Sequence, residues 1–395
     1  MEPPPRVVIA QGRFVLGNRL GGGAFGEVYT CTAVKPRETE TIEEFAVKIE
    51  PVKSPHAAQL HHEAYVYSAL SRPSVMVGIP KVRWFGQEGD FNILVMELLG
   101  PSLVDLMAHC GGRFDGKSTM MLAHQAVSRL QYVHACGYLH RDLKPDNLAM
   151  GLGKRSHHLY LLDFGLSKKY RDHSGHIPFR DGKSLTGTAR YVSIATHQGH
   201  QQSRKDDLES LAHVVIYLVR GNLPWQTVHA RTKEEKFDKI KYAKINTSPS
   251  QLCSKLPVAF EKFLEYARGL GFADKPDYEH CRKFFEANLK DMDASFDYRY
   301  KWVRPTPAEG TESLSCSMKS GSDASAKPQS ARSTAKSASQ SAGGSYAAAG
   351  WGKVRDQIRS RHQFAGRYSP AHGKQGKAAP LDESGDVLNL LAGGV

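Results

Sequence analysis

The stretch LHRDLKPDN, residues 139–147, carries three side chains that could act together on a phosphorylated ligand. The Asp142 carboxylate could orient a hydroxyl group or accept its proton, and Lys144 could neutralise charge that moves with a phosphoryl group. The amide oxygen of Asn147 could bind a divalent cation such as Mg²⁺. Every fixed position of the pattern H-R-D-L-x-x-x-N is present, which indicates phosphoryl transfer to a hydroxyl group.

A second cation ligand follows in LYLLDFG, where Asp163 comes directly after an apolar strand-like run. An aspartate in a turn can simply cap the turn. The order along the chain favours a role in binding Mg²⁺, because Asp163 follows Asp142 and Asn147 at the spacing that phosphoryl-transfer enzymes use.

The stretch LGGGAFGEV contains the glycine pattern G-x-G-x-x-G at Gly21, Gly23 and Gly26, followed by Val28. Glycines allow backbone amides to approach phosphate groups closely. By itself the pattern also fits a flexible hairpin or a dinucleotide site. A strand-like run follows the glycines here, whereas a dinucleotide site requires a helix, so we expect a phosphate-covering hairpin.

Lys48 lies in the strand-like run EFAVKIE. Because side chains alternate along a strand, it should face away from Val47 and Ile49 and share its face with the small residue Ala46. A lysine in this place could bind the α- and β-phosphates of a nucleotide if a carboxylate holds it. Glu63, in the helix-like segment that follows, is the candidate partner.

Two kinds of element must position these residues. Strand-like runs dominate residues 14–96, with one helix-like segment, HAAQLHHEAYVYSALS, among them. From Leu103 onward the apolar spacing of three and four residues is typical of helices, as in KSTMMLAHQAVSRLQYVHACG. The sequence therefore predicts an α+β fold with a small strand-rich lobe, a larger helical lobe and a cleft between them.

Composition places further limits on the protein. The 395 residues are 24% charged and 40% apolar, and the net charge is +13. These values fit a globular protein with a sizeable core, and no apolar run approaches the length of a membrane span. None of the six cysteines forms a C-x-x-C pair, so we expect them to be reduced thiols. After Arg304 the chain becomes rich in Ser, Ala, Gly and Lys, and residues 304–395 are predicted to be a disordered tail.

Residues 14–303 resemble the casein kinase I family of eukaryotic protein kinases. The resemblance rests on the strings WFGQEGDFNILVMELLGPSL, YLHRDLKPDNLAMGLG, LDFGLSKKYRD, LTGTARYVSI, QSRKDDLESL, LPWQ and DKPDY. It implies a bilobal kinase domain, with an N-lobe of about residues 14–99 and a C-lobe of about residues 100–303, that phosphorylates Ser or Thr in proteins with ATP and Mg²⁺.

The same resemblance implies the roles of individual residues. Asp142 would be the catalytic base, Lys144 would assist it, Lys48 and Glu63 would form an ion pair, and Asp207 would support the catalytic loop from beneath. Asn147 and Asp163 would hold Mg²⁺. The nucleotide would contact Leu20, Gly21, Gly22, Gly23, Ala24, Phe25, Gly26, Val28, Ala46, Lys48, Met96, Glu97, Leu99, Asn147 and Asp163.

The resemblance further implies substrates with an acidic or phosphorylated residue three positions before the target. The site for that anion would comprise Arg190, Gln226, Thr227 and Lys236. Arg190 could instead anchor its own loop through an ion pair. A monomer that is active without activation-loop phosphorylation, restrained by autophosphorylation of the tail, is expected in the cytoplasm, with nuclear access as a further option.

This chain departs from the family where it reads Ser193-Ile194-Ala195 in place of Ser-Ile-Asn. Other kinases carry Ala-Pro-Glu here, and Arg282 resembles the arginine that pairs with that glutamate. Two alternatives stay open: a catalytically inactive scaffold with the kinase fold, and a nucleic-acid binder driven by positive charge. Lys48, Asp142, Asn147 and Asp163 are all present, which favours catalysis over the inactive scaffold.

Overall fold

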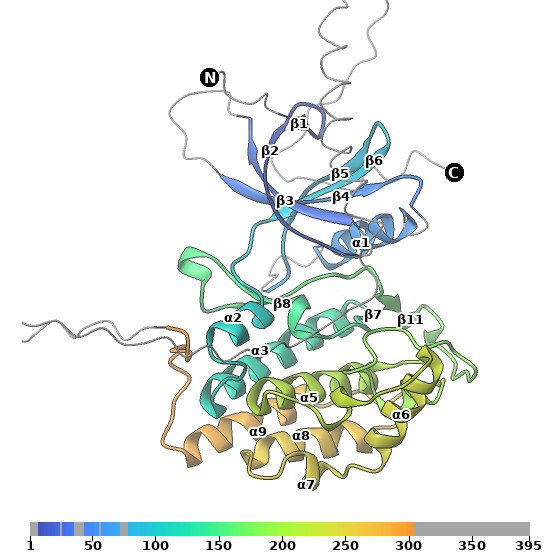
Figure 1. Ribbon diagram of the computed structural model, residues 1–395, viewed down its shortest axis with the longest axis vertical. Coiled ribbons are helices and arrows are strands. Elements are labelled where there is room, and N and C mark those ends of the chain that lie inside the picture. The colour runs from blue at the N-terminus through green and yellow to red at the C-terminus, as the bar shows by residue number, and fades with distance from the viewer. Residues whose placement is uncertain (1–6, 24–25, 35–42, 55–56, 72–77, 304–395) are drawn as a thin grey trace, which may run out of the picture. The chain divides into compact units, whose positions relative to one another are not determined.

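The computed structural model describes residues 7–23, 26–34, 43–54, 57–71 and 78–303 (Figure 1). The predicted tail, residues 304–395, lies outside the described residues. The predicted α+β arrangement is confirmed, because strands dominate the first part of the chain and helices the second.

The first part is a six-stranded antiparallel sheet in the order β1-β2-β3-β4-β6-β5. Its strands are β1 (Val8–Ile9), β2 (Phe14–Gly23), β3 (Gly26–Ala33), β4 (Glu44–Pro51), β5 (Val82–Glu88) and β6 (Phe91–Glu97). The sheet thus begins before residue 14, where the kinase domain was predicted to start. Helix α1 (Ala57–Leu70) contacts β4, β5 and β6, as Figure 1 shows.

Strand β4 confirms the predicted alternation. Phe45, Val47 and Ile49 are buried on one face, while Ala46 and Lys48 face a cavity on the other. The apolar face is held by the core of the sheet, so the register of β4 fixes which way Lys48 points.

The second part is mainly helical. Its helices are α2 (Leu103–His109), α3 (Gly116–Ala135), α4 (Ile194–His197), α5 (Arg204–Arg220), α6 (Lys233–Ile245), α7 (Pro249–Leu252), α8 (Val258–Gly269) and α9 (Tyr278–Asp291), with the 3₁₀ turns η1 (Pro145–Asn147), η2 (Gly153–Arg155) and η3 (Pro224–Thr227). Short strands lie between them: β7 (Tyr138–Leu139), β8 (Leu148–Met150), β9 (Leu159–Leu161), β10 (Lys168–Lys169), β11 (Arg171–Asp172) and β12 (Gly175–His176).

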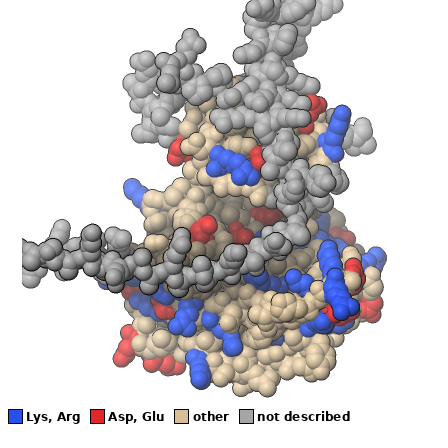
Figure 2. Space-filling model, viewed as in Figure 1, with Lys and Arg blue, Asp and Glu red and all other residues tan. Residues whose placement is uncertain are grey.

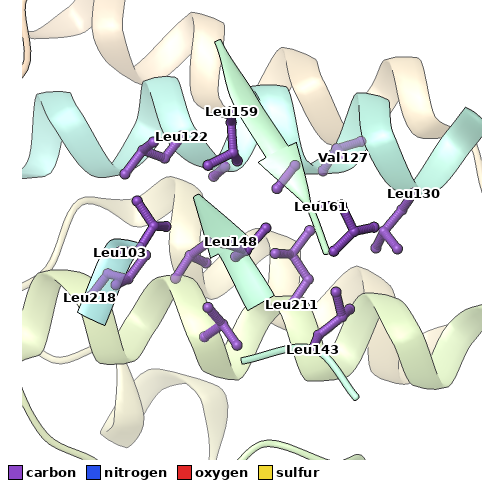
Figure 3. Close-up of a cluster of buried hydrophobic side chains, with 14 of the residues drawn as sticks. Leu103, Leu122, Val127, Leu130, Leu143, Leu148, Leu159, Leu161, Leu211 and Leu218 are labelled. Carbon is purple, nitrogen blue, oxygen red and sulfur yellow. The ribbon is translucent and has the colours of Figure 1, made fainter. Parts of the chain in front are cut away.

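The core of this part lies between α3 and α5, with the β8–β9 hairpin against them (Figure 3). Leu122 and Leu130 of α3 meet Leu148 and Leu161 of the hairpin there, and all four are at most 2% exposed. Each such side chain contributes roughly 1.5–3 kcal/mol by leaving water. Because η1 leads straight into β8, this packing also fixes the loop that carries Asp142.

Helix α5 begins at a defined residue. Ser203 precedes it, and the Ser203 amide donates to Asp206 Oδ2 at 2.7 Å. This capping interaction places Asp206 and Asp207 in the first turn, where carboxylates also face the positive end of the helix dipole. The helix ends at Gly221, whose φ of +88° suits glycine.

Candidate active site

A cavity of about 680 Å³ lies between the sheet and the helical part, and Figure 2 shows it as a hollow with acidic side chains inside. Its size falls within the range of small-molecule sites, roughly 300–1,000 Å³. The β2–β3 hairpin, β4 and α1 line one side, and η1, β8 and the residues after β9 line the other.

Most residues predicted to contact a nucleotide line this cavity. They are Leu20, Gly21, Gly22, Gly26, Val28, Ala46, Lys48, Met96, Glu97, Leu99, Asn147 and Asp163. Gly23 is the last residue of β2, and Ala24 and Phe25 lie outside the described residues, so the predicted contacts of these three stay predictions.

Sequence reasoning missed several lining residues: Tyr67, Leu98, Gly100, Pro101, Ser102, Asp105, Asp146, Ala149 and Leu162. Two of them carried a readable signal, since Ser102 and Asp105 form the capping box of α2. Asp146 lies inside the LHRDLKPDN stretch itself. The apolar members face the cavity only because of tertiary packing.

Gly26 explains why the hairpin needs glycine. Its φ is +136°, and a Cβ placed there would lie 2.5 Å from the Ile49 carbonyl oxygen of β4. Any other residue would push the hairpin away from β4, and with it the backbone that borders the cavity.

Lys48 lies among carboxylates. Its Nζ is 2.6 Å from Glu63 Oε2 and 3.9 Å from Asp163 Oδ1. Burial alone disfavours the ammonium, but attraction to Glu63 and Asp163 outweighs burial and raises the pKa of Lys48. Glu63 is 2% exposed, and burial raises its pKa to about 6 although Lys48 attracts its charged form. The predicted pair therefore forms, and it holds Lys48 towards the cavity.

Asn147 and Asp163 both border the cavity. The Asn147 Nδ2 donates to the Asp142 carbonyl oxygen at 2.9 Å, so the amide oxygen is the free ligand atom. Burial by itself raises the pKa of Asp163. The positive charges of Lys48, His140 and Lys144 lower this pKa by more than burial raises it, so the pKa of Asp163 lies below its ordinary value. An ionised carboxylate and an amide oxygen fit a hard divalent cation such as Mg²⁺.

Asp142 is buried and held from several directions. Its Oδ2 lies 2.8 Å from Lys144 Nζ, and its Oδ1 accepts a hydrogen bond from the Thr188 hydroxyl at 2.7 Å. Attraction to Asp142 outweighs the burial of Lys144 and raises the pKa of that lysine. The contact with Thr188 shows that a hydroxyl group can approach this carboxylate.

Asp207 supports the loop before Asp142, as the resemblance led us to expect. Its carboxylate accepts hydrogen bonds at 2.8 Å from the backbone amides of His140 and Arg141, and from His134 Nε2. Arg141 has a φ of +69°, an unusual value for a residue with a side chain. Asp207, which lies 66 residues after Arg141 in the chain, holds this backbone through the two amide hydrogen bonds.

The sequence left open how the loop around Ser193-Ile194-Ala195 is anchored. Arg282 is not its anchor, because the Arg282 guanidinium donates to Gln131 Oε1 at 2.6 Å on the exposed side of α3. A carboxylate of α5 contacts the loop instead. Glu209 Oε1 accepts a hydrogen bond from the Ile194 amide at 3.4 Å and lies 3.1 Å from Arg268 Nε.

Ser193 itself donates to Asp206 Oδ1 at 2.6 Å and caps α4 through the Thr196 amide at 3.0 Å. These contacts explain how Ala195 is tolerated. The polar anchors come from the neighbouring serine and from α5, so residue 195 need not supply one.

The residues predicted to form an anion site lie around the same loop. Arg190 is exposed, with its guanidinium 5.7 Å from the ring centres of Tyr191 and Tyr217. No carboxylate in the described part of the chain forms an ion pair with it, which argues against the anchoring alternative. The neighbouring turn η3, which holds Gln226 and Thr227, is joined to the loop.

That junction is a hydrogen bond from Trp225 Nε1 to the Arg190 carbonyl oxygen at 2.8 Å. The Gln226 side chain is occupied by the backbone amide of Leu223. Thr227 and Lys236 are exposed, and Lys236 shows no contact with Arg190 within the described residues. The structure thus brings η3 and Arg190 together but leaves Lys236 separate.

Within the described ranges, no helix is both long and apolar enough to cross a membrane. A family model for the protein kinase domain matches residues 14–289. The match starts at β2 and ends in α9, so it takes in the sheet, the cavity and the helices beneath it.

Proposed function

Because the chain belongs to the protein kinase family, we propose that it transfers the γ-phosphate of ATP to Ser or Thr hydroxyls of protein substrates, as casein kinase I enzymes do. The observation that carries this proposal is that the Lys48–Glu63 pair and Asp163 line one cavity, with Asp142 next to it through its hydrogen bond to the cavity residue Asn147. An inactive scaffold would not need these side chains held in this geometry.

In the proposed reaction, Asp142 orients the substrate hydroxyl and takes its proton, while Lys144 at 2.8 Å offsets the charge that develops nearby. Lys48, fixed by Glu63, binds the α- and β-phosphates. Asn147 and Asp163 are the residues that would hold Mg²⁺, which when bound neutralises phosphate charge. The glycine hairpin β2–β3 covers the phosphates with its backbone.

The test is transfer of labelled phosphate from ATP to peptides that contain Ser, Thr or Tyr as the sole acceptor. We expect labelling of the Ser and Thr peptides, with dependence on Mg²⁺. Labelling of the Tyr peptide alone would overturn the assignment to Ser and Thr. Absence of transfer to all three would favour the scaffold, and a steeply salt-dependent affinity for DNA would then favour a nucleic-acid binder.

We further propose that Arg190 receives an acidic or phosphorylated side chain three residues before the target. This arginine is exposed and forms no ion pair with a carboxylate among the described residues, and the adjacent η3 is hydrogen-bonded to the same loop. Arginine binds phosphate through strong, directional hydrogen bonds. Thr227, in the turn that is hydrogen-bonded to the loop, completes the proposed site, whereas Lys236, which shows no contact with Arg190 in the described part of the chain, is left out of it.

We expect Arg190→Ala to lower kcat/KM about tenfold or more for a peptide with phosphoserine at this position, since one charge-assisted contact is lost. For the matched peptide with alanine there, kcat/KM should change less than twofold. Steady-state kinetics on both peptides measures the difference. An equal loss on both would show that Arg190 serves the loop and not the anion.

Activity should also depend on Glu63. Its pKa is about 6, so acidification through pH 6 neutralises the carboxylate and releases Lys48. We expect kcat/KM for ATP to fall as the pH is lowered from 7 to 5, measured with an unprimed peptide so that no substrate phosphoserine titrates in this window. The side chain of Glu63→Gln is neutral at every pH in this range. This variant should therefore have low activity at pH 7, and its kcat/KM should not fall further as the pH is lowered to 5.

This loss should not reflect unfolding. The pKa of Glu63 is raised above its ordinary value, so the folded protein takes up this proton more readily than the unfolded chain. The contribution of Glu63 to stability therefore increases as the pH falls from 6 towards its ordinary pKa. A circular-dichroism melt at pH 5.5 that shows an unfolded protein would contradict our explanation.

We also propose constitutive activity, because the contacts that hold the loop at Thr188 and Ser193 come from unmodified side chains. Residues 304–395 would restrain the enzyme after autophosphorylation, as in similar kinases. A monomer in the cytoplasm, with access to the nucleus, completes the proposal.

A further inference from the structure

Four successive backbone carbonyls of the loop after Thr188 are held by side chains from four separate elements. Each carbonyl accepts a hydrogen bond from behind the loop, so the loop cannot shift as a unit without breaking several of them. The pairs are His197 Nε2 with Ala189 O at 3.0 Å, Trp225 Nε1 with Arg190 O at 2.8 Å, His213 Nδ1 with Tyr191 O at 2.8 Å, and Lys244 Nζ with Ala189 O at 3.0 Å and Val192 O at 2.5 Å.

Lys244, in the last turn of α6, is the only one of these four that binds two carbonyls of the loop. Its side chain is fully buried, and its Nζ lies 5.2 Å from the centre of the Trp225 ring. The two carbonyls, of Ala189 and Val192, are three residues apart, so one ammonium group bridges both ends of the segment. Lys244 also joins α6 to η3 through the aromatic ring.

The burial of this lysine is costly. No carboxylate lies within ion-pair distance of Lys244 in the described part of the chain, and Glu209, whose charge attracts it, is engaged by Arg268. Burial lowers the pKa of Lys244 to about 7; attraction to Glu209 opposes this shift and repulsion from Arg268 adds to it. A buried ammonium without a counter-ion is less favourable than an apolar residue of similar size. Packing alone therefore does not explain why lysine stands here.

The loop connects Lys244 to both groups that would meet a substrate. The Thr188 carbonyl accepts from the amides of Tyr191 at 2.8 Å and Val192 at 3.1 Å, so the segment that Lys244 holds also fixes Thr188. The Thr188 hydroxyl in turn reaches Asp142. With the carbonyls turned inward, the side chain of Arg190 is left on the outside.

We propose that Lys244 is a positioning residue for the protein substrate. By holding the carbonyls of Ala189 and Val192, it sets the place of Thr188 against Asp142 and the outward direction of Arg190. It does not touch the nucleotide cavity, so it governs peptide recognition and leaves ATP binding alone. This inference deepens the proposed kinase function, and its kinetic part rests on it.

The experiment compares Lys244→Met, which keeps the length and removes the donors, with Lys241→Met as a matched control. Lys241 is on the same helix, lies 2.8 Å from Asp238 and does not contact the loop. We expect Lys244→Met to lower kcat/KM for the peptide about tenfold, while KM for ATP stays within about twofold. Lys241→Met should change neither. If Lys244 were needed only for packing, Lys244→Met would lower the melting temperature without lowering kcat/KM for the peptide selectively.

Hydrogen exchange measures the positioning without catalysis. Backbone amides of residues 185–199 should exchange faster in Lys244→Met than in the wild type and in Lys241→Met. If exchange is faster in Lys244→Met but the wild type phosphorylates no peptide, the proposed function is refuted while the role of Lys244 in positioning the loop stands. Unchanged exchange and unchanged peptide kinetics in an active enzyme would overturn the role of Lys244.

A second variant covers the case in which Lys244→Met does not fold. Trp225→Phe keeps an aromatic ring beside Lys244 but removes the N–H that holds the Arg190 carbonyl, together with the volume of one buried ring. We expect the same pattern with a smaller loss, about threefold for the peptide and none for ATP. If Trp225→Phe changes neither the peptide kinetics nor the exchange of residues 185–199, anchoring of the carbonyls does not position the substrate.

Discussion

Asp142→Asn is expected to lower kcat by roughly 10²–10⁴-fold, the range that general-base catalysis contributes, while KM for ATP changes little. The amide cannot take the proton of the substrate hydroxyl. It is also a poorer partner for Lys144, whose Nζ lies 2.8 Å from Asp142 Oδ2. The fold should persist, because the amide has the same shape and can still accept from the Thr188 hydroxyl.

The measurement is single-turnover phosphate transfer to a peptide, with binding of a fluorescent ATP analogue as the check on the nucleotide site. Asp172→Asn is the matched control, because Asp172 is exposed in the β11–β12 hairpin and, among the described residues, its carboxylate hydrogen-bonds only to Ser174. It should retain wild-type rates. Transfer at an unchanged rate in Asp142→Asn would remove Asp142 from the mechanism and with it the main support for the proposed reaction.

Asp207→Asn is expected to reduce both stability and activity, although residue 207 does not reach the cavity. Its two oxygens accept from the amides of His140 and Arg141 and from His134. In asparagine one oxygen becomes an N–H donor, which must then face another donor. The buried group left unsatisfied costs about 2–3 kcal/mol.

Burial alone would raise the pKa of Asp207, but the hydrogen bond from His134 and the attraction of His134 and His140 lower it below its ordinary value. The carboxylate is therefore ionised in the folded protein at neutral pH, and the amide cannot replace its charge. Loss of these contacts frees the Arg141 backbone, whose φ is +69°. A shift of about 1 Å in the neighbouring Asp142 would lower kcat about 10²-fold.

Denaturant unfolding and steady-state kinetics test this prediction together. Asp206→Asn is an informative comparison, since Asp206 is the adjacent buried carboxylate but binds Ser193 and Ser203 and not the catalytic loop. We expect it to lose stability and keep more of its kcat than Asp207→Asn. Equal loss of kcat in both would show that α5 acts through general stability and not through the loop.

The sequence by itself predicted the sheet, the long helix α3 and the cavity-facing side of β4, because these depend on local periodicity. The alternation around Lys48 was readable since Val47 and Ile49 must be buried on the opposite face. The resemblance to kinases also predicted that Glu63 pairs with Lys48 and that Asp207 supports the loop at Arg141. No local sequence pattern indicates either contact.

The sequence left the anchor of the loop open, since Arg282 could only be compared with the arginine that pairs with the missing glutamate in other kinases. The helical pattern places Arg282 on α9, but only packing decides that this side of α9 meets Gln131 of α3. The anchor of the loop comes instead from Glu209 and Arg268, on helices α5 and α8, which lie side by side in Figure 1.

What the sequence determined is the chemistry that is available: a lysine, two aspartates and an asparagine in kinase order, on elements whose periodicity is visible. Only the tertiary structure decided how the substrate-facing loop is held. Its carbonyls are satisfied by His197, His213, Trp225 and Lys244. A backbone carbonyl is the same group at every residue, so its partner is set by where the chain packs and leaves no trace in the residue types of the loop.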